Sequence, residues 1–202
     1  YEDPNYTAHY HWRVGFFGSF EADGTDSASA LLSAADAWFR SRGLEESIGP
    51  IDPVAECWGF TISGFEKPPV FMSPHNPKDY PGWMEESGYE KAKDLLVYEV
   101  DVRKEYRIPA RFIRFETMFF ERNPGFTARR FNPKDFAAEV KRIVDILNVS
   151  VADNWGFVPV GDVERDAMAE KLKLIVDPDA IWFIERDGEP AACCLGFPDL
   201  NI

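Results

Sequence analysis

The sequence contains few of the residues that build metal centres and disulfide frameworks. Its 202 residues include three cysteines and three histidines. Cys193 and Cys194 are adjacent, so in a strand their side chains would point to opposite faces and could not pair. The odd number of cysteines indicates a reducing compartment, which we expect to be the cytoplasm, with the thiols buried as small apolar groups. His9 and His11 lie in residues 1–12, which we expect to be a loop, without a carboxylate or cysteine framework, so we predict no metal site.

The sequence also has no long hydrophobic run and little positive charge. No apolar stretch approaches the roughly 20 residues that a membrane-spanning helix needs. Lysine and arginine number 22 against 35 acidic residues, which gives a formal net charge of −13. This balance argues against nucleic acid and anionic membrane surfaces as partners, and it is compatible with a small-molecule amine as substrate. Phosphate loops, dinucleotide fingerprints and serine nucleophile elbows are absent from the sequence as well.

Residues 13–50 carry the strongest structural pattern. The stretch VGFFGSFE is dense in Phe and Val, which is typical of a strand buried on both faces. The following SASALLSAADAWFRSRG predicts a helix with Leu31, Ala35 and Trp38 at helical spacing and Gly43 as its stop. A short extended segment then ends at Pro50. Strand, helix and strand in this order predict a right-handed crossover with parallel strands, and therefore an α/β protein.

The middle of the chain is broken by proline and glycine. Strand candidates are residues 60–62 and 70–72, and a short helix is predicted over residues 78–87 between Pro77 and Gly88. Residues 95–98 (LLVY) are typical of a buried strand, and residues 103–123 predict a helix with Phe112, Phe115 and Phe119 on one face.

The C-terminal part predicts a strand, two helices and a hairpin. Residues 126–131 are strand-like, and a helix begins at Asn132-Pro133 with an apolar stripe of Phe136, Val140, Ile143 and Leu147. Asp162 is expected to cap a second helix that runs to about residue 176. Asp187-Gly188 lies between two apolar runs, the pattern of a two-residue hairpin. So apolar a hairpin should not be the last element of a sheet, and we expect the chain to be a fragment.

This order of elements resembles the opening of the GNAT fold of acyl-CoA-dependent N-acetyltransferases. The amino-acid sequence is also similar to that of a bacterial family of tandem GNAT-like proteins of unassigned substrate. The segments that carry the similarity are VGFFGSFE, AADAWFRSRG, GPIDPVAECWGF, GFEKPPVFM, GYEKAKDLLVY, NWGFVPV, LKLIVDPD and ERDGEPAACCLGFPDLN. The resemblance implies a mixed sheet flanked by helices. Residues 1–102 would form a first module that lacks its opening elements, residues 103–124 a connecting helix, and residues 125–202 the N-terminal half of a second module.

The resemblance also implies acetyl-CoA or another acyl-CoA as co-substrate. In the GNAT fold the CoA pyrophosphate binds backbone N–H groups at the start of the helix that follows the fourth strand. The equivalent loop of the first module, residues 21–26, has one glycine, no arginine or lysine, and three acids. We therefore predict that the first module does not bind CoA, and the corresponding loop of the second module would lie beyond Ile202.

Acyl transfer to an amine needs a base for the ammonium proton and an acid for the departing thiolate. Glu56, beside Asp52, is a candidate base, although a loop carboxylate that caps nearby N–H groups explains it as well. Tyr98 is a candidate acid, although alternation in a strand also accounts for it. Asn154 and Trp155 occupy the region where GNAT proteins contact acceptor substrates, with packing of the loop as the alternative for the tryptophan.

Two further features of the sequence weaken the assignment of functional residues. The pair His75-Asn76 departs from the aromatic-Asn pair that is usual in the family, and Cys57 has no placed histidine partner that would make it a nucleophile.

Three functions follow from this reading. The first is an acyl-CoA-dependent N-acyltransferase acting on an unknown amine, with catalysis mainly in the second module, so that the fragment itself is expected to be inactive. The second is a non-catalytic ligand-binding or scaffolding protein with the GNAT fold. The third is a relative of the tandem-GNAT aminoacyltransferases that build peptidoglycan bridges, which share the two-module layout.

Overall fold

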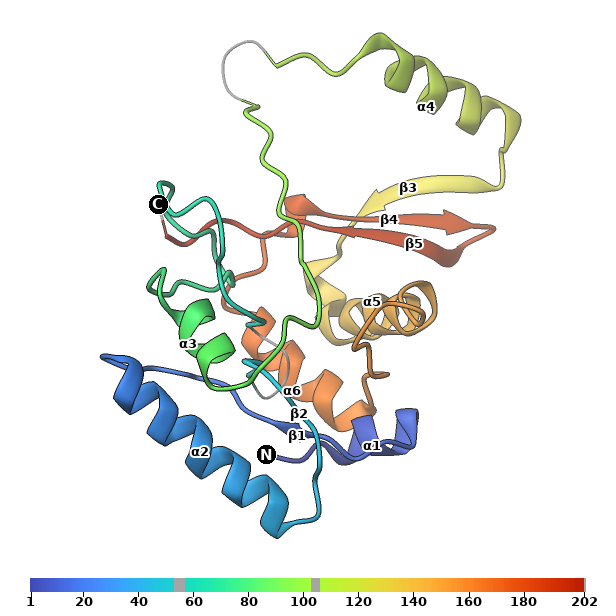
Figure 1. Ribbon diagram of the computed structural model, residues 1–202. Coiled ribbons are helices and arrows are strands. Elements are labelled where there is room, and N and C mark those ends of the chain that lie inside the picture. The colour runs from blue at the N-terminus through green and yellow to red at the C-terminus, as the bar shows by residue number, and fades with distance from the viewer. Residues whose placement is uncertain (53–56, 103–105, 202) are drawn as a thin grey trace. The chain divides into compact units, whose positions relative to one another are not determined.

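The computed structural model describes residues 1–52, 57–102 and 106–201 (Figure 1). Within these ranges the chain is mixed α/β, with six α-helices and two small sheets, which confirms the predicted α/β class. The chain divides into two compact units. Unit 1 comprises Tyr1–Ala92, Gly156–Pro159 and Asp199–Ile202, and unit 2 comprises Lys93–Trp155 and Val160–Pro198. The module boundaries inferred from the GNAT resemblance stay a prediction.

Unit 1 is organised around the predicted strand–helix–strand crossover. Strand β1 (Gly15–Phe16) pairs in parallel with β2 (Ser47–Ile48), and α2 (Thr25–Ser41) connects them. The strands are much shorter than VGFFGSFE suggested. Gly15 lies so close to the Phe39 ring that a Cβ atom there would be 2.3 Å from it, so helix and strand meet only because this residue is glycine.

The buried stripe of α2 differs from the predicted one. Ala28, Leu32 and Phe39 are buried, whereas Leu31 and Trp38 are exposed. The Arg42 guanidinium lies 3.7 Å from the centroid of the Trp38 ring, a cation–π contact at the surface. Gly43, with a φ of +68°, follows the helix as predicted.

The expectation of a loop over residues 1–12 is wrong, because Pro4–Tyr10 form helix α1. Asp3 caps it: its Oδ1 accepts hydrogen bonds from the backbone N–H groups of Asn5 (2.8 Å) and Tyr6 (3.1 Å). An N-cap aspartate followed by proline is a local helix-start signal that outweighs the missing apolar period. Tyr6 packs against Val14 and Phe16 in the core of unit 1.

The middle of the chain contains fewer strands than expected. The short helix is confirmed as α3 (Tyr80–Glu86), but residues 60–62, 70–72 and 95–98 are not strands. Leu96 and Tyr98 are 74% and 84% exposed, so the segment is not buried either. An apolar run becomes a strand only where a neighbouring strand pairs with it, and within the described residues no sheet includes this one.

Unit 2 contains an antiparallel sheet in the order β3-β4-β5, made of Phe126–Arg130, Ile181–Arg186 and Glu189–Leu195. The hairpin prediction is confirmed: Asp187 and Gly188 form the turn between β4 and β5 with φ values of 54° and 85°. Two consecutive positive φ angles suit the right-handed twist of the flanking strands.

One face of this sheet packs on α5 (Phe136–Ser150), which follows the 3₁₀ turn η2 (Pro133–Asp135). The core between them confirms the predicted stripe and consists of Phe131, Ile143, Ile181 and Phe183, with Phe136, Ile146, Leu147, Val176, Cys193 and Leu195 packed around it. Cys193 therefore faces the core, whereas Cys194 is exposed. The two thiols point apart as predicted, but the expectation of burial is wrong for Cys194.

Helix α4 (Ala110–Arg122) lies on the opposite side of the sheet from α5 (Figure 1). It begins after Pro109, later than predicted, because the residue before a proline is disfavoured in a helix. Helix α6 (Asp162–Leu172) and the 3₁₀ turn η3 (Pro178–Ala180) complete the unit. Asp162 does not cap α6: Gly161 is the N-cap, and the Asp162 carboxylate lies in the first turn, paired with Arg165. None of the described helices is both long enough and apolar enough to cross a bilayer.

Candidate functional site

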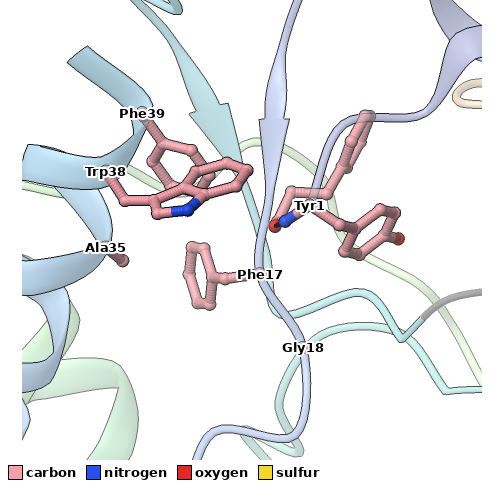
Figure 2. Close-up of a pocket in the computed structure, with 7 residues that line it drawn as sticks. Tyr1, Phe17, Gly18, Ala35, Trp38 and Phe39 are labelled. Carbon is pink, nitrogen blue, oxygen red and sulfur yellow. Dashed lines mark hydrogen bonds between the residues drawn. The ribbon is translucent and has the colours of Figure 1, made fainter. Parts of the chain in front are cut away.

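Unit 1 contains a hollow with aromatic walls between β1 and α2, which we call the aromatic pocket. Its volume is about 280 Å³, and its lining consists of Tyr1, Phe16, Phe17, Gly18, Ala35, Trp38 and Phe39. Figure 2 shows the rings of Trp38 and Phe39 projecting from α2 toward Phe17. The pocket can therefore receive an apolar group.

The lining of the aromatic pocket offers little that could take part in acid–base chemistry. Tyr1 supplies the one ionisable side chain of the lining, and its hydroxyl donates to the backbone carbonyl of Ile51 (3.2 Å). Burial, followed by the nearby charges of Asp3 and Asp52, raises the pKa of Tyr1 to about 12. The phenol keeps its proton at neutral pH and cannot act as a general base there.

The acidic loop before α2 is held in place by its own carboxylates and by α3. The Tyr80 hydroxyl donates to Glu21 Oε2 (2.8 Å), and the backbone N–H of Ala22 donates to the Tyr80 oxygen (3.0 Å). Ser27 Oγ, in the first turn of α2, donates to Asp23 Oδ1 (2.6 Å). A pyrophosphate placed at this helix start would meet two fixed negative charges.

Of the two predicted catalytic residues, Tyr98 is the one that lies within the described chain. Glu56 lies outside the described residues. Its neighbour Asp52 accepts hydrogen bonds from the backbone N–H (2.7 Å) and the hydroxyl (2.9 Å) of Ser19. Tyr98 lies in the exposed segment after α3. Burial and then Asp52 raise the pKa of Cys57, which disfavours the nucleophilic thiolate. The roles of Glu56 and Tyr98 stay predictions.

The predicted acceptor residues Asn154 and Trp155 lie together in the loop between α5 and α6. Both are exposed, and the backbone N–H of Asn154 donates to Val151 O (2.9 Å). The base of this loop is closed by Asn148: its Nδ2 donates to Val160 O (3.0 Å), and its Oδ1 accepts from Val160 N (2.9 Å). Sequence reasoning missed Asn148, although a polar residue directly after the apolar stripe of α5 is the signal for it.

Asn76 is buried and has a structural role. Its Oδ1 accepts from Thr61 N (2.7 Å), and its Nδ2 donates to Thr61 O (3.2 Å) and Pro77 O (2.8 Å). Every polar atom of this amide is used, so Asn76 is not available to a ligand. The described residues contain no group of three or more His, Cys, Asp or Glu side chains that could hold a metal ion.

Unit 2 contains a larger open groove between α4 and the outer face of the sheet, which we call the α4 groove. Its volume is about 510 Å³, and its lining consists of Phe115, Glu116, Phe119, Phe120, Ala128, Trp182 and Ile184. Phe119 also contacts Phe126 of β3, with ring centroids 5.2 Å apart, and this contact joins the helix to the sheet. Sequence reasoning identified the phenylalanine face of α4 but missed Glu116, an acid set between Phe115 and Phe119.

No protein-family model matches the chain, and no solved structure matches it significantly. Among curated proteins, a bacterial ceramide synthase of Caulobacter vibrioides is 32% identical over 190 residues, 93% of this chain. Protein YghO of Escherichia coli K12 is 33% identical over the same share. The alignments cover 48% of each of these proteins, so the chain spans about half the length of the curated relatives it matches.

Proposed function

We propose that this chain is part of an acyltransferase that forms an amide bond on a small-molecule amine. The observation that carries the proposal is the similarity, along 93% of the chain, to a protein named bacterial ceramide synthase. A ceramide is the fatty-acid amide of a long-chain amino alcohol, so its synthesis joins an acyl group to the nitrogen of a lipid amine. By this similarity the amine of the present protein is a long-chain one.

We further propose that the protein has a tandem GNAT-like architecture, that it acts in the cytoplasm and that acyl-CoA is its acyl donor. It is supported by the parallel β1–α2–β2 crossover of unit 1 and by the β3–α5–α6–hairpin order of unit 2. In the reaction the neutral amine nitrogen attacks the thioester carbonyl, the C–N bond forms, the C–S bond breaks, and the thiol leaves with a proton. Glu56 is the proposed base and Tyr98 the proposed acid, with Asn154 and Trp155 near the acceptor.

The donor would bind away from residues 21–26. The carboxylates of Glu21 and Asp23 stand at the start of α2, where they repel a pyrophosphate. The same observation favours a second candidate function, in which the protein keeps the fold as a non-catalytic ligand-binding or scaffolding protein.

The first test is amide formation by the protein that contains this chain. The purified protein is incubated with palmitoyl-CoA and sphinganine, and mass spectrometry detects the N-acyl product while free thiol is titrated. We expect both products in equal amounts. Acyl-CoA binding in calorimetry without any amide product, across amines of several chain lengths, would instead support the non-catalytic candidate.

The proposed acid is tested by Tyr98→Phe. Loss of a general acid is expected to lower kcat by about 10²-fold or more, with little change in the affinity for the amine. Tyr106→Phe is the control, since Tyr106 is an exposed tyrosine of the same connecting stretch without a proposed role. An unchanged kcat in Tyr98→Phe would remove this residue from the mechanism and leave amide formation itself untouched.

A further inference from the structure

The α4 groove combines an open apolar surface with a single carboxylate. Six of its lining residues are apolar, from α4 on one side and from β3 and β4 on the other, and its volume of about 510 Å³ lies within the usual range of small-molecule sites, about 300–1,000 Å³. Phe115 is 65% exposed and Trp182 is exposed as well, so the described chain leaves these walls uncovered. Apolar walls of this extent suit an alkyl chain.

The placement of the carboxylate follows from the helical period. One side of α4 lines the groove, because residues three and four apart share a face of a helix. The lining residues on this side are Phe115, Glu116, Phe119 and Phe120. Ala128, Trp182 and Ile184 alternate with the residues that face α5, so they form the outer face of the sheet. Glu116 therefore stands among aromatic rings at the edge of an apolar groove.

Charge selects among amphiphiles that fit such a groove. Glu116 is the one charged residue of the lining, and a carboxylate beside apolar walls favours an ammonium over a hydroxyl or another carboxylate. Arg130, on the same face of the sheet, stacks on Trp182 at 5.1 Å and is paired with Asp179, so its charge is already compensated. The formal net charge of −13 also favours a cationic ligand at long range.

We propose that the α4 groove binds a long-chain primary amine, with its alkyl chain against Phe115, Phe119 and Trp182 and its ammonium group beside Glu116. The inference deepens the proposed function and rests on it for the choice of an amine as ligand. It gives the amine a binding surface in unit 2 that is built mainly by α4 and the sheet, and that is separate from the loop of Asn154 and Trp155 after α5.

The test measures binding of defined amphiphiles to the chain by calorimetry, below their micelle concentrations. The probes are dodecylamine, 1-dodecanol of equal length, and hexylamine. We expect dodecylamine to bind at least about fivefold more tightly than dodecanol, and far more tightly than hexylamine, since each buried methylene contributes roughly a fourfold gain in affinity.

Two pairs of variants locate the site. Glu116→Gln is expected to abolish the preference for the amine over the alcohol, whereas Glu121→Gln, five residues on and turned about 140° around the helix axis, is expected to keep it. Ala128→Arg places a cation in the groove and is expected to weaken dodecylamine binding at least about tenfold. Thr127→Arg adds the same charge on the opposite face of β3 and is expected to leave binding unchanged. Circular dichroism confirms that each variant is folded.

Equal loss in both members of a pair, or an amine preference that survives Glu116→Gln, would overturn the proposal. These readouts do not depend on catalysis. Groove binding without amide formation would contradict the proposed function alone, and amide formation by a protein whose groove binds no amine would contradict the groove alone.

Discussion

Glu139 shows how a single buried residue links the elements of unit 2. It lies on α5 and is 1% exposed, and its carboxylate accepts from Arg129 Nη1 of β3 (2.7 Å) and from the backbone N–H of Asn132 (3.3 Å). Arg142 completes the cluster. Burial by itself would raise the pKa of Glu139, but the hydrogen bonds and charges of Arg129, Asn132 and Arg142 outweigh it and hold this pKa below its ordinary value.

The substitution Glu139→Gln is expected to lower the free energy of unfolding by about 2 kcal/mol at pH 7. Removing one partner from a fully buried ion pair costs about 3–5 kcal/mol of unfolding free energy. The expected loss is smaller here because Arg129 is partly exposed and solvent screens the pair. A depressed carboxyl pKa stabilises the fold at pH values above the ordinary pKa of glutamate. That contribution is lost as the pH falls through the lower folded-state pKa.

Urea unfolding at pH 7 and pH 3 measures this effect. Wild type and Glu139→Gln should differ most at pH 7, and the difference should shrink at pH 3, below the ordinary pKa of glutamate. Glu170→Gln is the control, because Glu170 forms an exposed pair with Lys173 and its loss is expected to cost less than about 1 kcal/mol. A constant difference between wild type and Glu139→Gln across this pH range would contradict the electrostatic account.

At the scale of elements, the hairpin and helix α1 are both decided by local backbone chemistry. Gly188 has a φ of 85°, a region that L side chains rarely adopt, and the Asp-Gly pair predicts this turn from sequence. Helix α1 depends equally on local chemistry, since Asp3 caps it and Pro4 occupies its first position. That helix could have been predicted, had the capping signal been weighed above the absence of an apolar stripe.

Two glycine substitutions should change stability in opposite directions. Gly188→Ala is expected to destabilise the protein by roughly 1 kcal/mol, because alanine is strained at positive φ. Gly82→Ala, inside α3, is expected to stabilise it by up to about 1 kcal/mol, since a Cβ atom there meets no neighbour within 4 Å and alanine favours the helix. Thermal unfolding followed by circular dichroism measures both shifts. Stabilisation by Gly188→Ala would contradict the assignment of the turn, and destabilisation by Gly82→Ala would contradict the account of α3.

At the scale of the whole molecule, the stretch that follows α3 contains a highly exposed apolar segment. Residues 95–98 carry four apolar side chains, all exposed, and they form neither helix nor strand. A buried strand and an exposed extended segment differ sharply in their availability to a protease.

Brief treatment with chymotrypsin is therefore expected to cleave first near Leu96 or Tyr98. Cleavage at Phe183, which is fully buried in the core of unit 2, should come only after global unfolding. Mass spectrometry of the early fragments identifies the order of cuts. Resistance of residues 95–98 while other sites are cut would favour the buried strand that the LLVY pattern predicts.

The sequence by itself determined the features that depend on neighbours along the chain. Periodicity and turn residues predicted the α/β class, the parallel crossover around α2, the apolar stripe of α5 and the Asp187-Gly188 hairpin, because each is specified within one or two elements. Tertiary structure decided the rest. Whether LLVY pairs as a strand depends on a partner strand. The burial of Glu139 depends on Arg129 from β3, and the α4 groove exists only where α4, which carries Glu116, lies beside Trp182 and Ile184 of β4. These are contacts between residues distant in the chain, and a single sequence carries no local signal for them.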